Sequence, residues 1–343
     1  MNIIATVGPK TIDKWIIKEL IESGVDILRL NCAHFSKEEF ELVIKYSKSI
    51  KSDIHILVDL SGKKVRISND LKYIYKIYNN QEVFFCGEDY YNSLDINEIS
   101  KKKYIPLNIT TEKIKRSNVE AISIKDNTMK FEVLDVSDGI VKTKVMKGGI
   151  IRAGKGCNIT NIYDEENIIS KKDKENIIWA LDNNLDIICQ SFVESKRDID
   201  EIKRYIYEST EEKNYDIWAK IETPMGINNI DYILKSVDTV VIGRGDLVPE
   251  AGLLDAIKMQ EKVIKVVKRK NKRVIIGTHL LNSMKNGNPA TLPEVESIYK
   301  FINDGVDGFL LAGETSIGKA PIQTVKFLKS TIDYYKKDIK KYE

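Results

Sequence analysis

Several residue patterns that mark particular protein classes are missing from this chain of 343 residues. Its cysteines, Cys32, Cys86, Cys157 and Cys189, form no CxxC pair and stand near no group of histidines, so we expect reduced thiols and no structural zinc. No apolar run approaches the roughly 18 residues that a membrane helix needs. The first residues, MNIIATVGPK, lack the charged segment and cleavage site of a secretory signal, so we expect a soluble, cytoplasmic protein.

An excess of one charge sign is missing as well. The chain has 54 basic and 51 acidic residues and a net charge of +3, which gives no electrostatic reason to expect nucleic-acid or membrane partners. A hydrophobic content of 42% is ample for a large core, so disorder is excluded. Since a (β/α)₈ barrel takes about 250 residues, the length fits one barrel with an insertion of roughly a hundred residues.

Short apolar runs alternate along the chain with longer amphipathic stretches, the pattern of repeated βα units. We predict eight strands from these runs, at residues 3–7, 25–31, 54–60, 185–192, 217–222, 239–243, 274–278 and 306–311. Helical periodicity is clearest at residues 13–23, 37–50, 198–207, 254–270 and 297–304. The sequence therefore predicts an α/β protein with a (β/α)₈ TIM barrel.

The alternation breaks between the third and fourth predicted strands. Residues 68–168 contain short alternating pieces rich in Ile, Val, Tyr and Phe, punctuated by Gly and Asn/Asp pairs. Such pieces are typical of a small all-β domain. We therefore expect a barrel built from residues 1–67 and 169–343, with an inserted β-rich lid that projects from the catalytic face.

Charged and polar side chains end several predicted strands. They include Arg29, Lys220, Glu222, Asp246 and Thr278. Lys220 and Glu222 share one face of their strand, because strand side chains repeat every two residues. Cations can balance a transferring phosphoryl group, and Mg²⁺ is held by one or two carboxylates with substrate oxygens. This pattern favours a metal-assisted enzyme that acts on a phosphorylated carboxylic acid.

Seven ordered motifs resemble those of the pyruvate kinase family. They are ATVGP, LRLNCAH, VDLSGKKVR, WAKIET, IGRGDL, GTHLLNSM and LLAGETSIGKAP. KGCNIT, followed by ISKKD, resembles the stretch where the lid of that family returns to the barrel. The resemblance covers barrel and lid, and it implies a Mg²⁺- or Mn²⁺-dependent glycolytic enzyme that converts phosphoenolpyruvate and ADP to pyruvate and ATP.

The resemblance also implies roles for single residues. Arg29 would bind the phosphate, and Lys220 would stabilise the transferring phosphoryl group. Glu222 and Asp246 would hold the divalent metal. Thr278 would lie near the carbon that is protonated.

Further positions match the binding sites for pyruvate and the nucleotide. The backbone at Gly245 and Asp246, together with Thr278, would receive the carboxylate of pyruvate. The positions that line the nucleotide phosphates in this family correspond here to Arg66, His34 and Lys172.

The monovalent-cation pocket of the family is altered. Asn31 and Asp59 match it, but its usual Ser is Ala33, and Lys64 stands where a Glu is common. This combination resembles the potassium-independent branch, in which a lysine ammonium replaces K⁺. We therefore expect activity without K⁺.

Other departures leave alternatives open. His279 replaces a Gln, Val248 replaces a Gly, and residues 288–294 (NPATLPE) lack an expected Arg. We also expect the family's C-terminal regulatory domain to be absent, which leaves a monomer or a barrel-to-barrel homodimer. The alternatives are a kinase for a different enol or hydroxy acid, a metal-dependent enolpyruvate lyase or aldolase, and a non-catalytic metabolite-binding descendant.

Overall fold

The computed structural model describes residues 1–33, 36–124, 128–162, 169–210 and 215–342. These form two compact units. The barrel unit consists of Met1–Gly62, Ile169–Leu247 and Leu253–Glu343, and the insertion unit consists of Lys63–Ile168 and Val248–Gly252. Among the described residues, no helix has the length and apolar character needed to cross a membrane.

Eight parallel strands close the barrel, in the order β1, β2, β3, β12, β13, β14, β15 and β16. Their bounds are β1 Asn2–Thr6, β2 Ile27–Asn31, β3 His55–Leu60, β12 Ile187–Gln190, β13 Asp216–Ile221, β14 Thr239–Gly243, β15 Arg273–Gly277 and β16 Gly308–Leu311. Each predicted strand is present, which confirms the TIM barrel. The largest difference is at β12, which is shorter at both ends than the apolar run that predicted it.

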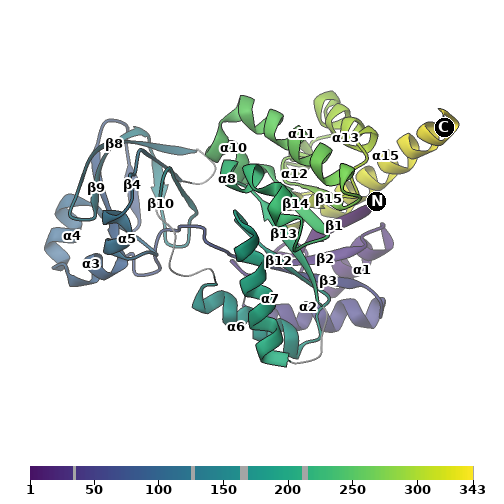
Figure 1. The fold of residues 1–343 in the computed structure, drawn as a ribbon, viewed down its shortest axis with the longest axis horizontal. Coiled ribbons are helices and arrows are strands. Elements are labelled where there is room, and N and C mark those ends of the chain that lie inside the picture. Colours follow the sequence, from purple (N-terminus) through teal and green to yellow (C-terminus); the bar gives the residue numbers. More distant parts are fainter. Residues whose placement is uncertain (34–35, 125–127, 163–168, 211–214, 343) are drawn as a thin grey trace. The chain divides into compact units, whose positions relative to one another are not determined.

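Helices surround the barrel strands (Figure 1). The longer ones are α1 Lys14–Glu22, α2 Lys37–Ile50, α6 Lys171–Asp182, α7 Lys196–Thr210, α10 Arg244–Ala251, α11 Leu253–Arg269, α13 Leu292–Asn303 and α15 Pro321–Tyr342. Short helices are α8 Pro224–Asn228, α9 Ile230–Ile233, α12 Asn282–Lys285 and α14 Gly313–Ser316. Side chains cap the amino ends of α1, α2 and α6. Asp13, Ser36 and Ser170 each accept a hydrogen bond from a backbone N–H of the first turn.

Inward side chains fill the barrel with an apolar layer. Its members are Ile4, Ile27, Leu57, Ile187, Cys189, Trp218, Val241, Ile275 and Leu310. Since strand side chains face the same side every two residues, the residue two positions after each of these also points inward, nearer the carboxyl ends of the strands. That rule places Arg29, Asp59 and Lys220 directly above the apolar layer, and it fixes where the polar site is built.

The insertion unit contains two sheets. One has the strand order β11-β7-β8-β9-β5-β6 and the other pairs β10 with β4. The bounds are β4 Tyr75–Ile77, β5 Glu82–Gly87, β6 Tyr104–Leu107, β7 Ala121–Ile124, β8 Met129–Ser137, β9 Ile140–Lys147, β10 Gly149–Ile151 and β11 Cys157–Ile159. The unit is β-rich, but it is not all-β: it also carries α3 Glu88–Ser93, α4 Ile96–Lys102 and α5 Thr111–Lys115. These helices have at most seven residues, too few for a clear 3.6-residue period in the sequence.

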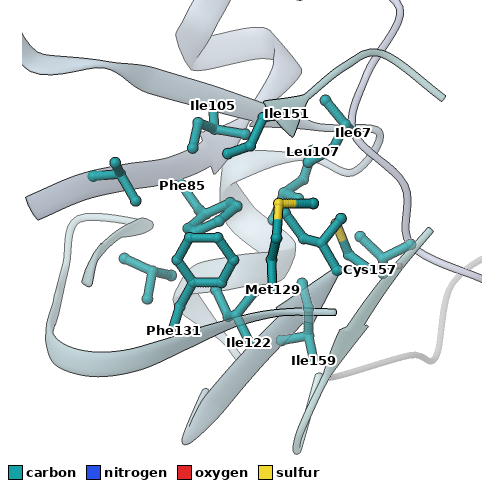
Figure 2. Packing of buried hydrophobic residues seen from close by; sticks show 14 of the residues in the cluster. Ile67, Phe85, Ile105, Leu107, Ile122, Met129, Phe131, Ile151, Cys157 and Ile159 are labelled. Carbon is teal, nitrogen blue, oxygen red and sulfur yellow. The ribbon is translucent and has the colours of Figure 1, made fainter. Parts of the chain in front are cut away.

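The insertion unit has its own hydrophobic core (Figure 2). Phe85 and Phe131 pack edge to face, with ring centroids 5.0 Å apart. Met129, Ile122 and Ile159 are buried in the same cluster. All buried members of this core belong to the insertion unit, so its packing does not depend on barrel side chains.

Candidate active site

Arg29, Asp59 and Lys220 form a buried charge cluster at the carboxyl ends of the barrel strands. The Arg29 guanidinium donates from Nε to Asp59 Oδ2 at 2.7 Å, and its second contact, from Nη2 to the same oxygen, is 2.6 Å. Lys220 Nζ lies 3.2 Å from that oxygen. Asp59 is 1% exposed, so one carboxylate shielded from water balances two cations.

The electrostatics of this cluster favour the charged form of both Asp59 and Lys220. Burial raises the pKa of Asp59, but the charges of Lys220 and Arg29 outweigh it, and the pKa is lower than usual. Burial lowers the pKa of Lys220, but Asp59 and Glu222 outweigh it, and the pKa is higher than usual. Both groups therefore remain ionised at neutral pH.

Two hydroxyl groups complete the cluster, and neither was predicted from the sequence. Ser191 donates to Asp59 Oδ1 at 2.9 Å and accepts from Lys220 Nζ at 2.9 Å. Thr6 accepts from Arg29 Nη1 at 2.7 Å and donates to the Leu311 carbonyl at 2.8 Å. A periodicity argument could have found both, because each lies two residues after an inward apolar residue, Cys189 or Ile4.

Glu222 lies next to Lys220 on the inward face, as the alternation of β13 predicts. Its Oε1 is 3.4 Å from Lys220 Nζ, and its Oε2 accepts from the Phe192 backbone N–H at 3.1 Å. The carboxylate also packs against Gly243 so closely that a Cβ there would be 2.4 Å from Oε1. Only glycine leaves room for it at the end of β14.

Asp246 is in the first turn of α10, three residues after Gly243, and is partly buried. Glu222 and Asp246 thus come from the ends of adjacent strands. Within the described residues, no group of three or more His, Cys, Asp or Glu side chains could hold a metal by itself. Two carboxylates nevertheless suit Mg²⁺, which takes its remaining ligands from water and substrate oxygens, so the residues present fit that ion.

Thr278 follows β15 in a strained backbone conformation. Its φ is 67° and that of His279 is 53°, both in the left-handed region. The Thr278 hydroxyl accepts from the Gly245 N–H at 2.7 Å and donates to the Gly277 carbonyl at 2.6 Å. The structure therefore brings two predicted substrate-binding residues, Gly245 and Thr278, into direct contact.

Arg244 contacts the backbone of this turn, and no pattern in the sequence singles it out. Its guanidinium donates to the Thr278 carbonyl from Nε at 3.0 Å and from Nη2 at 2.6 Å, and Nη2 also donates to the His279 carbonyl at 2.6 Å. It lies 5.2 Å from the centre of the Phe301 ring. Burial lowers the pKa of Arg244 to about 10, so the side chain is still charged at neutral pH.

Two hydrogen bonds join the loop after β3 to the start of α6. The Ser61 and Gly62 N–H groups each donate to the Asp173 carboxylate at 3.0 Å. Burial raises the pKa of Asp173, although these hydrogen bonds oppose the rise. Lys172, the residue before it, is exposed.

Four further residues were predicted, at Arg66, Lys64, Asn31 and His34. Arg66 is in the insertion unit, where its Nη1 donates to the Gly154 carbonyl at 3.3 Å. Lys64, also in that unit, lies along Gly156. Asn31, in the barrel unit, accepts from the Ala33 N–H at 3.1 Å. His34 lies outside the described residues.

Fold and site together define a (β/α)₈-barrel enzyme with a cluster of charged groups at the carboxyl ends of its strands, where barrel enzymes place their active sites. The family model described as "Pyruvate kinase, barrel domain" matches residues 1–325. The chain therefore belongs to the pyruvate kinase family.

Curated relatives agree with this assignment. The "Pyruvate kinase" of Clostridium perfringens is 30% identical over 94% of this chain and 67% of the relative. The "Pyruvate kinase" of Thermoplasma acidophilum is 28% identical over 97% of this chain and 58% of the relative. The "Pyruvate kinase 1" of Saccharomyces cerevisiae is 31% identical over 96% of this chain and 66% of the relative. The chain thus spans between 58% and 67% of the length of these relatives.

Proposed function

We propose that this chain transfers the phosphoryl group of phosphoenolpyruvate to ADP and releases pyruvate and ATP. The observation that carries the proposal is the buried cluster in which Lys220 lies between the carboxylates of Asp59 and Glu222, with Arg29 on the same aspartate. Preorganised cations in a site shielded from water stabilise a transferring phosphoryl group, because their charges need no reorganisation during the reaction.

Arg29 and Lys220 have separate tasks in this proposal. Asp59 and Thr6 fix the Arg29 guanidinium, so it can orient the phosphate of the substrate. Ser191 and Asp59 hold the Lys220 ammonium beside Glu222, so it can neutralise charge on the phosphoryl group as the group moves. Side chains of the barrel unit itself thus hold both cations in place.

Glu222 and Asp246 would hold a divalent metal, Mg²⁺ or Mn²⁺. When bound, the metal would supply positive charge that balances the negative charge of the phosphate and of the substrate acid. The contact with the Phe192 N–H and the lack of space beside Gly243 restrict the Glu222 carboxylate to one orientation.

Thr278 and Gly245 would receive the carboxylate end of pyruvate. The Gly245 N–H and the Thr278 hydroxyl already contact each other, so an acid oxygen can replace the Thr278 oxygen as acceptor for that N–H. The released hydroxyl could then face the carbon that is protonated. Arg244 would act as a positioning residue, because it bonds both carbonyls of the strained turn.

The nucleotide phosphates would be bound by Arg66, His34 and Lys172. We assign the insertion, residues 68–168, the role of a lid on the barrel of residues 1–67 and 169–343. A closed lid excludes water and so protects transfer from hydrolysis. Lys64, in place of K⁺, would serve the pocket of Asn31 and Asp59, and the enzyme would not need that ion.

We further propose a cytoplasmic enzyme that is a monomer or a barrel-to-barrel homodimer. Exposed apolar side chains on α11, Leu253, Leu254 and Ile257, give a barrel surface on which a second copy could pack. Sedimentation of the purified chain distinguishes the two states.

The test is ATP formation from phosphoenolpyruvate, ADP and Mg²⁺, measured in a bulky organic cation buffer and again with K⁺. We expect turnover in both buffers and its loss in Glu222→Ala. Glu261→Ala, an exchange at an outer helix, is the matched control and should retain activity. Phosphoenolpyruvate binding without ATP formation would refute the proposed acceptor, and a severalfold increase with K⁺ would refute the role of Lys64.

A further inference from the structure

The chain leaves the barrel unit after Gly62 and returns to it at Ile169, and one buried carboxylate lies at both ends of the insertion. Asp173 accepts from the Ser61 N–H at Oδ1 and from the Gly62 N–H at Oδ2, each at 3.0 Å. Its own backbone N–H donates to the Ser170 hydroxyl at 3.0 Å, the cap of α6. Asp173 therefore joins the last two residues before the insertion to the first helical turn after it.

Each carboxylate oxygen of Asp173 is used by a different backbone donor. The residue is 0% exposed, so bulk water does not compete for these hydrogen bonds. A side-chain amide at this position has a single oxygen and would turn its NH₂ group toward one of the two N–H donors. The contact therefore requires a carboxylate, and a polar side chain of the same shape does not replace it.

The loop that Asp173 holds is packed tightly against the end of β12. Gly62 has a φ of 62°, and a Cβ at this position would be 2.2 Å from the Ser191 carbonyl oxygen. Only glycine lets the loop lie so close to that backbone. The Ser191 hydroxyl in turn bonds Asp59 and Lys220. The loop before the insertion thus lies on a part of the barrel that buried charges already hold in place.

We propose that Asp173 is a positioning residue that fixes the hinge of the insertion. Its carboxylate holds the two residues before the insertion against the helix that follows it, and so restricts the directions in which the chain leaves the barrel unit. A restricted hinge limits the insertion to few positions, among them the one that binds the nucleotide. The inference rests on the proposed function in one respect, because it takes the insertion to be a lid over the nucleotide.

Hydrogen exchange of the Ser61 and Gly62 amides in the full chain tests the contact directly. Asp173→Asn keeps the shape of the side chain but can satisfy only one of the two N–H groups. We expect these amides to exchange about tenfold faster in the variant, because the lost hydrogen bond to a charged acceptor no longer opposes local opening.

Steady-state kinetics of the same variant test the hinge. KM for ADP should rise about tenfold, because the lid adopts its nucleotide-binding position less often. The Kd of phosphoenolpyruvate, measured by calorimetry, should change by less than about twofold, because the barrel groups proposed to bind the acid are not altered. A loss of this kind in one substrate alone is not expected from general destabilisation.

Asp198→Asn is the matched control. Asp198 is also buried in the first turn of a barrel helix, α7, and accepts from the Glu194 and Ser195 N–H groups at 2.8 Å. Both bonds use the same oxygen, Oδ2, so an amide oxygen can keep them. The control removes a buried negative charge but no hydrogen bond at the hinge. Its exchange rates at Ser61 and Gly62 and its KM for ADP should match those of the wild type.

Three results would overturn the proposal. Unchanged exchange in Asp173→Asn would mean that the carboxylate does not hold the loop. Faster exchange with an unchanged KM for ADP would mean that the loop does not set the position of the insertion. An equal increase in KM for ADP and in the Kd of phosphoenolpyruvate would indicate a general loss of structure.

Failure of the proposed function has a different signature. A wild-type chain that forms no ATP would refute that function, whatever Asp173 does. The exchange rates and the Kd of Mg²⁺-ADP, measured by calorimetry in place of KM, would then decide on the hinge: faster exchange with weaker nucleotide binding in Asp173→Asn supports it, and no change in either refutes it.

Discussion

At the scale of single residues, the site depends on one carboxylate, Asp59, with two cations and a hydroxyl around it. The sequence could place Lys220 and Glu222 on one face of their strand, because side-chain alternation follows from strand geometry alone. It could not show that Asp59 joins the two cations. That contact involves β2, β3 and β13, and their distance apart depends on barrel closure.

Lys220→Met should abolish phosphoryl transfer, with a loss of at least about 10²–10³-fold in kcat, since a preorganised charge is removed at the transferring group. Initial rates of ATP formation measure the effect. Metal-dependent exchange of pyruvate methyl protons with solvent deuterium should remain in part. The control, Lys258→Met, changes a side chain that is 80% exposed on α11. Normal transfer in Lys220→Met would remove the role assigned to this lysine.

Asp59→Asn should destabilise the barrel unit at neutral pH by about 3–5 kcal/mol, because two buried cations lose their counter-charge. The depressed pKa of Asp59 stabilises the fold above the unfolded value of about 3.9, and this contribution is lost as pH falls through the folded pKa. The difference in the free energy of unfolding between wild type and variant should therefore become smaller below about pH 4. Urea unfolding at several pH values measures it, and a constant gap would contradict this account.

At the scale of elements, the turn between β15 and α12 carries two non-glycine residues at positive φ, Thr278 and His279. A strand prediction that ends on Thr278 places the residue correctly, but cannot show this strain, which depends on contacts with Arg244. The three helices of the insertion unit were missed for a different reason: they are short, and α5, for example, buries only Ile114.

Arg244→Lys should lower kcat/KM for phosphoenolpyruvate by about tenfold or more, since an ammonium cannot reproduce the forked contacts to two carbonyls. Steady-state kinetics test this, with Arg269→Lys on α11 as the matched control. If Arg244 acts through the turn, the variant should mainly raise KM for phosphoenolpyruvate and leave KM for ADP unchanged. Equal changes in both would indicate a general loss of structure.

At the scale of the whole molecule, the chain consists of two units with separate hydrophobic cores. The eight-stranded barrel was predictable because its strands are continuous apolar runs with polar ends. The arrangement of the insertion strands was not, because the pairing of short strands depends on long-range contacts that alternation does not specify.

Phe85→Ala should destabilise the insertion unit by about 3–5 kcal/mol and leave the barrel unit unchanged. The three tryptophans, Trp15, Trp179 and Trp218, all belong to the barrel unit, so their fluorescence reports on that unit alone. Circular dichroism reports on both units. On heating, the variant should lose part of its dichroism before its tryptophan fluorescence changes, and coincident transitions at a lowered temperature would show that the units unfold together.

The insertion also affects how the barrel is completed during synthesis. Strands β3 and β12 are neighbours, with Leu57 in register with Ile187, yet the whole insertion separates them along the chain. A flexible segment of that length must lose much of its conformational entropy before the two strands meet. A segment that has already folded around its own core has far fewer conformations, so it loses less entropy at that step. An early-folding insertion would therefore shorten the search that closes the barrel, and changes in the core of the insertion would slow refolding of the barrel unit.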